Sequence, residues 1–283
     1  MNRHVLHLLS DSTGETATAA ANAVLSQFEN PDITLRMHVF VRSAADIDAA
    51  VKAIRKEPGP VVYTLLDSKL SDRLVTGVDD LGVETIPLLN PLFKAVRDRL
   101  GAPRRNRPGK QYQIDAKYFG RVAAIDYAMA LDDGATADRL RKADVILLGV
   151  SRTSKTPTCL YLAVRGVKAA NVPLVPGAPL PPGLDDALAA GVPAVGLTAS
   201  PTRLAQIRTQ RLEVIGSEKG IDYAELPRVR EEVSEALMTF ERLGIPTIDV
   251  TRRSIEETAA SIMALMRDDL DATERGENPE GAA

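Results

Sequence analysis

The segment from Gly149 to Thr156, Gly-Val-Ser-Arg-Thr-Ser-Lys-Thr, has the residue types and order of a phosphate-binding loop. It follows the apolar run 145–148, which is typical of a buried strand, and it precedes a segment with helical patterning. In such a loop, backbone N–H groups and the positive end of a helix dipole converge on an anion. The spacing predicts that Lys155 reaches a terminal phosphate and that the Thr156 hydroxyl coordinates Mg²⁺. The predicted phosphate-binding residues are Gly149, Val150, Ser151, Arg152, Thr153, Ser154, Lys155 and Thr156.

Ser154 departs from the pattern G-x-x-x-x-G-K-[ST], which has glycine at this position. A serine brings a Cβ that must be accommodated, but its hydroxyl can donate to phosphate. The departure therefore weakens the motif without excluding it. The alternative is that residues 151–156 only cap a helix, because Ser and Thr are favoured at that position.

Two further groups of residues have the types needed for phosphoryl transfer. Asp249 lies near the end of the strand-like run 245–250, where a carboxylate can hold Mg²⁺ through water, although any half-buried strand can end in Asp. The helix predicted after residue 200 carries Arg203, Arg208 and Arg211, and arginines can stabilise the charge of a transferred phosphoryl group. Their spacing does not form one tight stripe, which leaves a solvated helix face as the alternative.

Strand-like and helix-like segments alternate along the N-terminal part of the chain. Period-two alternation of apolar residues over 33–41 and continuous apolar runs elsewhere predict strands. Because parallel strands need crossover connections, this order predicts a parallel sheet with helices on both faces. We predict a Rossmann-like α/β domain over residues 1–101. Its predicted strands are 5–9, 33–41, 61–66 and 83–89, and its predicted helices are 15–28, 43–56, 71–81 and 90–101.

The loop from Ser10 to Thr16 follows the first predicted strand, at the edge where open α/β sheets bind ligands. It is rich in hydroxyl groups, so it could hold phosphate or a phosphorylated partner. Its single glycine, Gly14, does not make the G-x-G-x-x-G pattern of a dinucleotide site. A helix N-cap with a tight turn explains the loop equally well.

Residues 102–113 interrupt the alternation with Pro, Gly and four cations, which predicts an interdomain linker. Residues 114–270 repeat the strand–helix order around the loop 149–156, which predicts a P-loop kinase-like α/β domain. The polar residues 271–283 predict a disordered tail. In this half the predicted helices are 115–131, 157–170, 200 onward, 225–243 and 254–266, and the predicted strands are 145–148, 172–175, 192–197 and 245–250.

Composition limits the class of protein. A length of 283 residues predicts about two domains, and 45% hydrophobic with 26% charged residues is ordinary for a soluble protein. A net charge of −3 provides no electrostatic footprint for nucleic acid. No segment has the pattern of a signal peptide or the apolar length of a membrane span, and the single cysteine, Cys159, fits a reducing compartment. We therefore expect a cytoplasmic protein without nucleic-acid or membrane partners.

Six separated strings, in order along about positions 3–268, resemble the bifunctional regulatory proteins of pyruvate, phosphate dikinase and of phosphoenolpyruvate synthase. Ser154 and the string Val-Pro-Leu-Val-Pro-Gly at 172–177 resemble the dikinase branch, whereas the synthase branch tends to keep glycine before the lysine. The strings are 10–17, 132–134 (Asp-Asp-Gly), 149–157, 169–177, Ser-Pro at 200–201 with Arg-Leu at 203–204, and 248–259.

The resemblance implies transfer of the β-phosphoryl group of ADP, rather than the γ-phosphoryl group of ATP, to a threonine of the dikinase beside its phosphorylated catalytic histidine. This modification inactivates the target. The resemblance also implies the reverse reaction by phosphorolysis, in which inorganic phosphate is consumed and pyrophosphate is released. ADP, Mg²⁺, phosphate and pyrophosphate are then the expected ligands, the dikinase is the expected partner, and a homodimer is compatible with the family.

Transfer to a threonine needs a general base for the hydroxyl proton. Asp115, Asp132, Asp133 and Asp249 are candidates, and sequence spacing does not choose among them. The predicted catalytic residues are Lys155, Asp249, Asp132 and Arg203.

Other functions share the same predicted core. A small-molecule P-loop kinase would not need residues 1–101, so activity on a metabolite after their deletion would favour it. A nucleotide-sensing protein would bind ADP without turnover. The same chemistry directed at phosphoenolpyruvate synthase is a further alternative.

Overall fold

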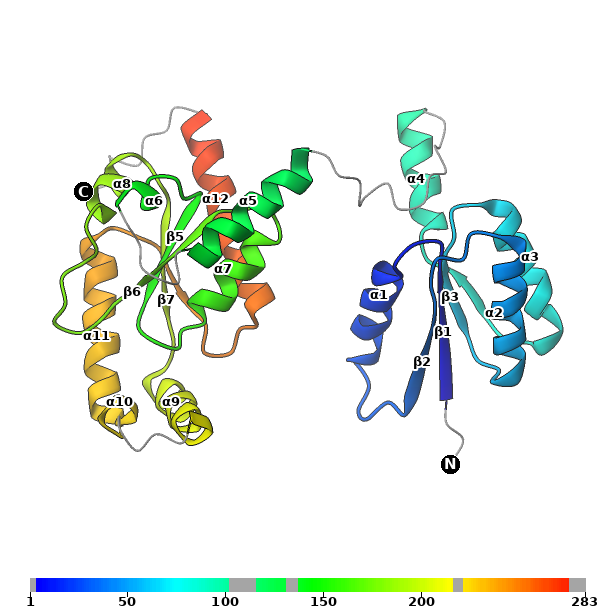
Figure 1. Cartoon of the computed structure of the whole chain (residues 1–283), viewed down its shortest axis with the longest axis horizontal. Coiled ribbons are helices and arrows are strands. Elements are labelled where there is room, and N and C mark those ends of the chain that lie inside the picture. Colours follow the sequence, from blue (N-terminus) through cyan, green and yellow to red (C-terminus); the bar gives the residue numbers. More distant parts are fainter. Residues whose placement is uncertain (1–3, 102–115, 131–136, 216–220, 275–283) are drawn as a thin grey trace. The chain divides into compact units, whose positions relative to one another are not determined.

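The computed structural model describes residues 4–101, 116–130, 137–215 and 221–274 (Figure 1). The chain divides into two compact units, residues 1–113 and 114–283. Each unit contains one four-stranded parallel sheet flanked by helices, so the predicted two-domain α/β class is confirmed. The predicted linker 102–113 lies outside the described residues.

Unit 1 builds its sheet in the order β2-β1-β3-β4, with all neighbours parallel. β1 therefore lies between β2 on one side and β3 on the other, and the strand order reverses next to it. The elements are β1 (His4–Ser10), α1 (Glu15–Leu25), β2 (Ile33–His38), α2 (Ala44–Lys56), β3 (Val61–Thr64), α3 (Ser68–Val78), the 3₁₀ helix η1 (Asp79–Leu81), β4 (Thr85–Pro87) and α4 (Asn90–Leu100).

Helices cover both faces of this sheet because successive residues of β1 point to opposite sides. Leu8 packs with Ala17 and Ala21 of α1, whereas Leu9 joins the larger core under α2 and α3. Figure 1 shows α1 on one side of the strands and α2 with α3 on the other. The predicted start of the second helix is confirmed, since Ser43 and Asp46 form a reciprocal capping box directly before α2.

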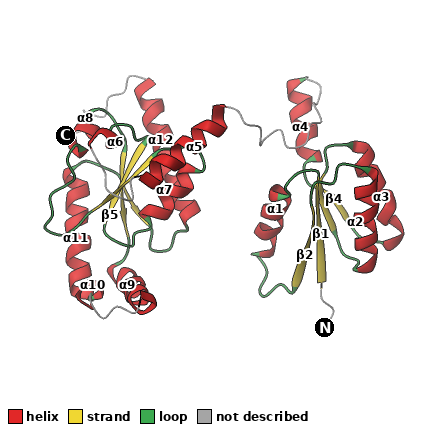
Figure 2. Ribbon diagram, in the orientation of Figure 1, coloured by secondary structure: helices red, strands yellow, loops and turns green. Residues whose placement is uncertain are grey.

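Unit 2 has the equivalent strand order, β6-β5-β7-β8, again with all neighbours parallel. Figure 2 shows its strands in the middle of the unit with helices around them. The elements are α5 (Ala116–Ala130), α6 (Ala137–Leu140), β5 (Val145–Gly149), α7 (Lys155–Ala163), β6 (Ala169–Pro173), α8 (Leu184–Ala189), β7 (Ala194–Thr198), α9 (Pro201–Ile215), α10 (Ile221–Ala224), α11 (Leu226–Arg242), β8 (Thr247–Asp249) and α12 (Ile255–Glu274).

The central strand β5 is buried over its whole length. α7 packs against α5 and α12 on one side of the sheet, and α11 lies along the other side (Figure 1). The approach of α11 is close, because a Cβ at Gly196 of β7 would lie 2.6 Å from ring carbons of Phe240. The sheet therefore positions the ends of β5, β6 and β7 firmly between two helical layers.

The ends of two helices differ most from the sequence-based prediction. α7 ends at Ala163 rather than near residue 170, because Gly166 adopts a φ of 86° and the N–H groups of Gly166 and Val167 donate back to the last turn. Ala169 and Ala170 instead pair with β5, where burial outweighs the weak strand propensity of alanine. α12 continues to Glu274, past the predicted end at residue 266 and into the predicted tail.

Among the described helices, none is both long and apolar enough to cross a bilayer. Within the same described ranges, no group of three or more His, Cys, Asp or Glu side chains is placed to hold a metal ion.

Candidate active site

The loop 149–156 leaves the carboxyl end of β5 at the point where the strand order of unit 2 reverses. β5 pairs with β6 on one side and with β7 on the other, so the connection after β5 leads to one side of the sheet and the connection after β7 leads to the other. Open α/β sheets bind ligands in the crevice at such a point. The predicted phosphate-binding residues thus occupy the ligand-binding edge of their sheet.

The backbone of the loop is tightly constrained. A Cβ at Gly149 would lie 2.5 Å from the carbonyl oxygen of Leu197, so only glycine fits where β5 ends beside β7. Arg152 and Ser154 both adopt left-handed conformations, with φ of 74° and 60°, and α7 starts directly after Ser154. Left-handed residues in a turn orient successive N–H groups toward one side, which forms an anion-binding concavity.

Thr153 and Lys155 turn inward beneath this loop, and both side chains donate to the same acceptor. The Thr153 hydroxyl lies 2.9 Å from the Val150 carbonyl oxygen, and the Lys155 Nζ lies 2.8 Å from it. Only 6% of Lys155 is exposed. Burial is the main cause that lowers the pKa of Lys155 to about 8, and the positive charge of Arg208 is a smaller cause in the same direction. The loop therefore holds a poorly solvated ammonium that an anion would stabilise.

This low pKa predicts how ligand affinity depends on pH. A bound phosphate favours the ammonium form, so the affinity for ADP should be constant below about pH 8 and should fall as the pH rises through 8 toward 10. The second pKa of a phosphate group, about 6, lies below this window. Calorimetric titration with ADP between pH 7 and 9.5 measures the effect. Lys155→Arg is the control, because arginine stays charged throughout; an equal decline in both proteins would contradict the prediction.

Ser154 occupies a conformation that glycine adopts without strain. A left-handed conformation costs a non-glycine residue roughly 1 kcal/mol. We therefore expect Ser154→Gly to retain activity and to raise the free energy of unfolding by about 0.5–1 kcal/mol. Urea unfolding and ADP titration test both parts. Ser234→Gly, on the exposed side of helix α11, should instead destabilise; loss of phosphate binding in Ser154→Gly would show that the serine hydroxyl is required.

Thr156 lies in the first turn of α7 and faces β6. Its hydroxyl oxygen accepts a hydrogen bond from Asn171 Nδ2 at 3.0 Å. Among the described residues, the buried Asn171 Oδ1 has no hydrogen-bond partner. A hydroxyl and an amide oxygen are ligands of the type that a hydrated Mg²⁺ accepts, so these residues fit the predicted cation.

A buried ion pair supports the loop from behind. Arg208 of α9 is fully buried, and its Nη2 donates to Glu232 of α11 at 2.7 Å and to the Ser151 carbonyl of the loop at 3.2 Å. Its Nη1 donates to the Tyr223 carbonyl, and its guanidinium stacks on the Tyr223 ring, whose hydroxyl is hydrogen-bonded to Ser151 Oγ. Two helices remote in sequence thus fix the conformation of the loop.

The sequence contains a signal for this pair, although the spacing of the arginines left a solvated helix face as the alternative for Arg208, and Glu232 was not among the predicted site residues. Arg208 lies one helical turn after the buried Leu204, within the apolar stripe of α9. Glu232 lies between Val229 and Ala236 on the buried face of α11. A charged residue within an apolar stripe is expected to be paired, so opposite charges on the buried faces of two helices indicate an ion pair.

Comparison with known proteins is consistent with this site. The kinase/pyrophosphorylase family model matches residues 6–263, which is most of the chain. The chain belongs to the kinase/pyrophosphorylase family. A relative from Caulobacter vibrioides is 46% identical over 92% of this chain and 82% of its own length. A relative from Hyphomonas neptunium is 44% identical over 93% of this chain and 94% of its own length. Both carry the name pyruvate, phosphate dikinase regulatory protein, as does a relative from Paramagnetospirillum magneticum that is 44% identical over 94% of this chain and 85% of its own length.

Membership in the kinase/pyrophosphorylase family makes the chain a phosphotransferase. Of the remaining predicted catalytic residues, the structure describes Arg203 and Asp249. Arg203 is exposed in the first turn of α9, and its N–H is capped by the Ser200 hydroxyl. Asp132 lies outside the described residues, as do the alternative bases Asp115 and Asp133.

Asp249 lies at the end of β8, which is separated from β5 by β7 and so stands about 10 Å away in the sheet. Its Oδ1 accepts from the backbone N–H and the hydroxyl of Thr251, and the Thr251 hydroxyl oxygen accepts from Ser200 N at 2.7 Å. This carboxylate therefore organises the turn after β8 and ties it to the start of α9. Its catalytic role in the kinase/pyrophosphorylase remains a prediction.

The loop 10–16 of unit 1 lies at the corresponding edge of the first sheet, after β1. Asp11 is buried; its Oδ2 accepts from Leu66 N at 2.8 Å, and its carbonyl accepts from Arg42 Nε at 2.9 Å. Gly14 caps α1 with a φ of 82°. These bonds account for the turn as a structural feature, and a ligand role for it stays a prediction.

Proposed function

We propose that the chain is a bifunctional, ADP-dependent serine/threonine kinase and phosphorylase that regulates pyruvate, phosphate dikinase. The observation that carries the proposal is the loop between β5 and α7, with its left-handed turns and buried Lys155 ammonium, in a member of the kinase/pyrophosphorylase family. The names of relatives that match over more than nine-tenths of this chain favour the dikinase as the target. The single cysteine of this chain favours a cytoplasmic location.

In the kinase direction, the threonine oxygen forms a bond to the β-phosphorus of ADP while the bond from that phosphorus to the bridging oxygen of AMP breaks. The products are phosphothreonine, AMP and the hydroxyl proton. In the other direction, an oxygen of inorganic phosphate attacks phosphothreonine, the bond from phosphorus to the threonine oxygen breaks, and threonine takes up a proton as pyrophosphate leaves. Both reactions transfer a phosphoryl group between two oxygens, so the same phosphate-binding loop can bind the reactants of both.

The protein contributes position and charge in this scheme. The loop amides would hold the diphosphate, and Lys155 would leave the Val150 carbonyl to bind the oxygens on which charge develops. Mg²⁺, held near Thr156 and Asn171, would supply further charge neutralisation. Arg208 and Glu232 would keep the loop in its binding conformation, because the Ser151 carbonyl is one of the acceptors of Arg208.

The test uses purified protein with the phosphorylated dikinase and, in parallel, with phosphoenolpyruvate synthase. With ADP, we expect formation of AMP and loss of dikinase activity, and no transfer from ATP alone. With the modified dikinase and inorganic phosphate, we expect pyrophosphate and recovered activity. Transfer only from ATP, or only to the synthase, would overturn the assigned donor or target respectively.

A further inference from the structure

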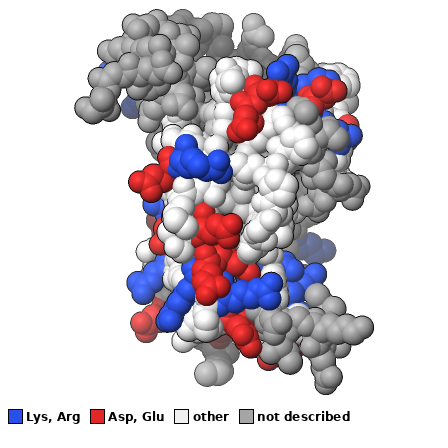
Figure 3. Space-filling model, turned by 90° about the vertical axis from the view of Figure 1, so that its left-hand side faces the viewer, with Lys and Arg blue, Asp and Glu red and all other residues white. Residues whose placement is uncertain are grey.

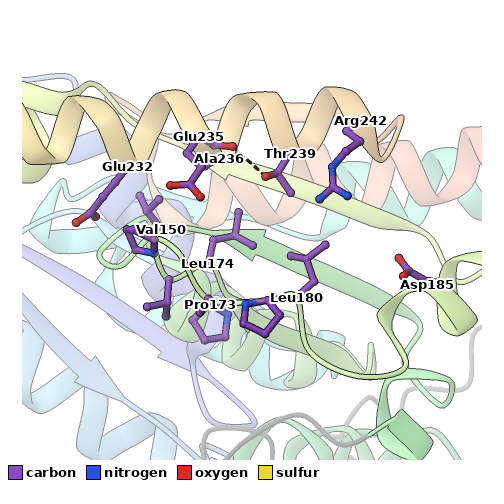
Figure 4. Close-up of a pocket in the computed structure, with 14 residues that line it drawn as sticks. Val150, Pro173, Leu174, Leu180, Asp185, Glu232, Glu235, Ala236, Thr239 and Arg242 are labelled. Carbon is purple, nitrogen blue, oxygen red and sulfur yellow. Dashed lines mark hydrogen bonds between the residues drawn. The ribbon is translucent and has the colours of Figure 1, made fainter.

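A groove runs from the phosphate-binding loop along the side of unit 2 that carries α11. It has a volume of about 410 Å³. Val150 of the loop and Glu232 of α11 lie at one end, and Asp185 lies at the other (Figure 4). One wall is the extended segment after β6, with Leu174 and Leu180 turned toward the groove, and the opposite wall is α11 (Figure 4). The first wall thus consists mainly of apolar side chains and prolines, whereas polar atoms form most of the exposed lining of the groove.

The polar groups of this groove are mainly acceptors. Three prolines, Pro173, Pro176 and Pro179, lie in the first wall and have no N–H to donate. Glu235 on α11 and Asp185 are exposed, and among the described residues neither forms an ion pair. Figure 3 looks onto the side of the unit that carries α11 and shows a group of acidic side chains beside an uncharged band, with lysine and arginine side chains next to the same group.

The charge balance of the lining is negative. With Glu232 neutralised by Arg208, two free carboxylates face one guanidinium, that of Arg242. An occupant that satisfies this lining must supply donors and positive charge, and it must also cover apolar surface. The extended shape of the groove suits a polypeptide segment rather than a compact ligand.

The groove is also joined to the phosphate-binding loop. Val150 lines it and accepts the hydrogen bond from Lys155. Glu232 lines it and holds Arg208, which in turn donates to the Ser151 carbonyl. A segment lying in the groove would therefore leave it beside the position of the phosphates.

We propose that this groove receives an extended segment of the protein substrate that carries lysine or arginine side chains, and so presents the accepting threonine to the loop. The inference rests on the proposed function, since it assumes a protein acceptor. Glu235 is the group that would contact a cation of the segment near the loop, and Leu174 and Leu180 would pack on its apolar side chains.

The first test reverses one charge on the wall. Glu235→Lys should raise the KM for the dikinase about tenfold and leave kcat and the KM for ADP within about twofold, because the change affects recognition of the protein alone. Glu241→Lys is the matched control, since Glu241 is exposed on the same helix outside the groove. Equal effects of the two substitutions, or no effect of either, would overturn the inference.

The second test does not depend on catalysis. A photoreactive p-benzoylphenylalanine replaces Thr239, which lines the groove, or Leu237, which is exposed on another side of α11. Irradiation with purified dikinase should cross-link through position 239 to a segment rich in lysine or arginine, and only weakly through position 237. Equal cross-linking, no cross-linking, or cross-links between two copies of this chain would overturn the groove assignment. If cross-linking succeeds while ADP supports no transfer, the proposed reaction is wrong and the docking groove stands.

Discussion

Lys155→Met should reduce phosphoryl transfer from ADP about 100- to 1,000-fold and weaken ADP binding at least about tenfold. The Lys155 ammonium lies against the loop, with its Nζ 2.8 Å from the Val150 carbonyl oxygen. Methionine has a similar length and flexibility but no charge, so it removes the electrostatic contact while keeping the packing. Steady-state assays of AMP formation and calorimetric titration with ADP measure the two effects.

The same substitution should raise the melting temperature of the ligand-free protein. Burial lowers the pKa of Lys155 to about 8, which means that the folded state disfavours the ammonium at neutral pH, and methionine removes this cost. The Val150 carbonyl remains bonded to the Thr153 hydroxyl. Lys142→Ala, at an exposed site of the same unit, should change neither activity nor melting temperature. A Lys155→Met protein that binds ADP normally would falsify the assignment of the loop.

Arg208→Met should destabilise the protein by about 3–5 kcal/mol, because it leaves the Glu232 carboxylate buried without its main partner. Removing both charges of the ion pair should restore the stability of the protein but not its affinity for ADP. The double variant Arg208→Met with Glu232→Met should recover most of the free energy of unfolding, since two apolar side chains replace a buried ion pair. Its affinity for ADP should stay at least about tenfold below that of the wild type, because the Ser151 carbonyl has lost its donor.

Urea unfolding and ADP titration of the wild type, the two single variants and the double variant measure the free energy of unfolding and the affinity for ADP. The surface pair of Arg73 and Asp48, which is about half exposed, is the control, and Arg73→Met should cost less than about 1 kcal/mol. If the double variant bound ADP as well as the wild type, Arg208 would have only a structural role.

Local patterns in the sequence account for most of the elements of the fold. Capping boxes at Ser43 and Ser254 mark the starts of α2 and α12, and the apolar run over β5 marks a strand that is buried throughout. These signals are reliable because the groups that satisfy a helix end lie within a few residues of it. The end of α7 was missed because Ala169 and Ala170 resemble helix residues and become a strand only by pairing with β5.

The position of Asp249 in the sheet also could not be predicted from the sequence. Its place at the end of a strand was visible in the sequence, but the order of strands in the sheet was not. The structure puts β7 between β8 and β5, and it engages the Asp249 carboxylate with Thr251. Strand order depends on which crossovers pack best, so no local pattern reports it.

The residue types of the phosphate-binding loop and its attachment to a strand and a helix are encoded in consecutive residues, so the amino-acid order was sufficient to locate them. The contacts that hold the loop in place are not encoded in consecutive residues. Arg208 reaches Ser151 across 57 positions and Glu232 across 24, and the pKa of Lys155 falls because helices and loop together exclude water from it. Such contacts and such burial arise when α9 and α11 pack on the sheet, since solvation and pairing depend on neighbours in space.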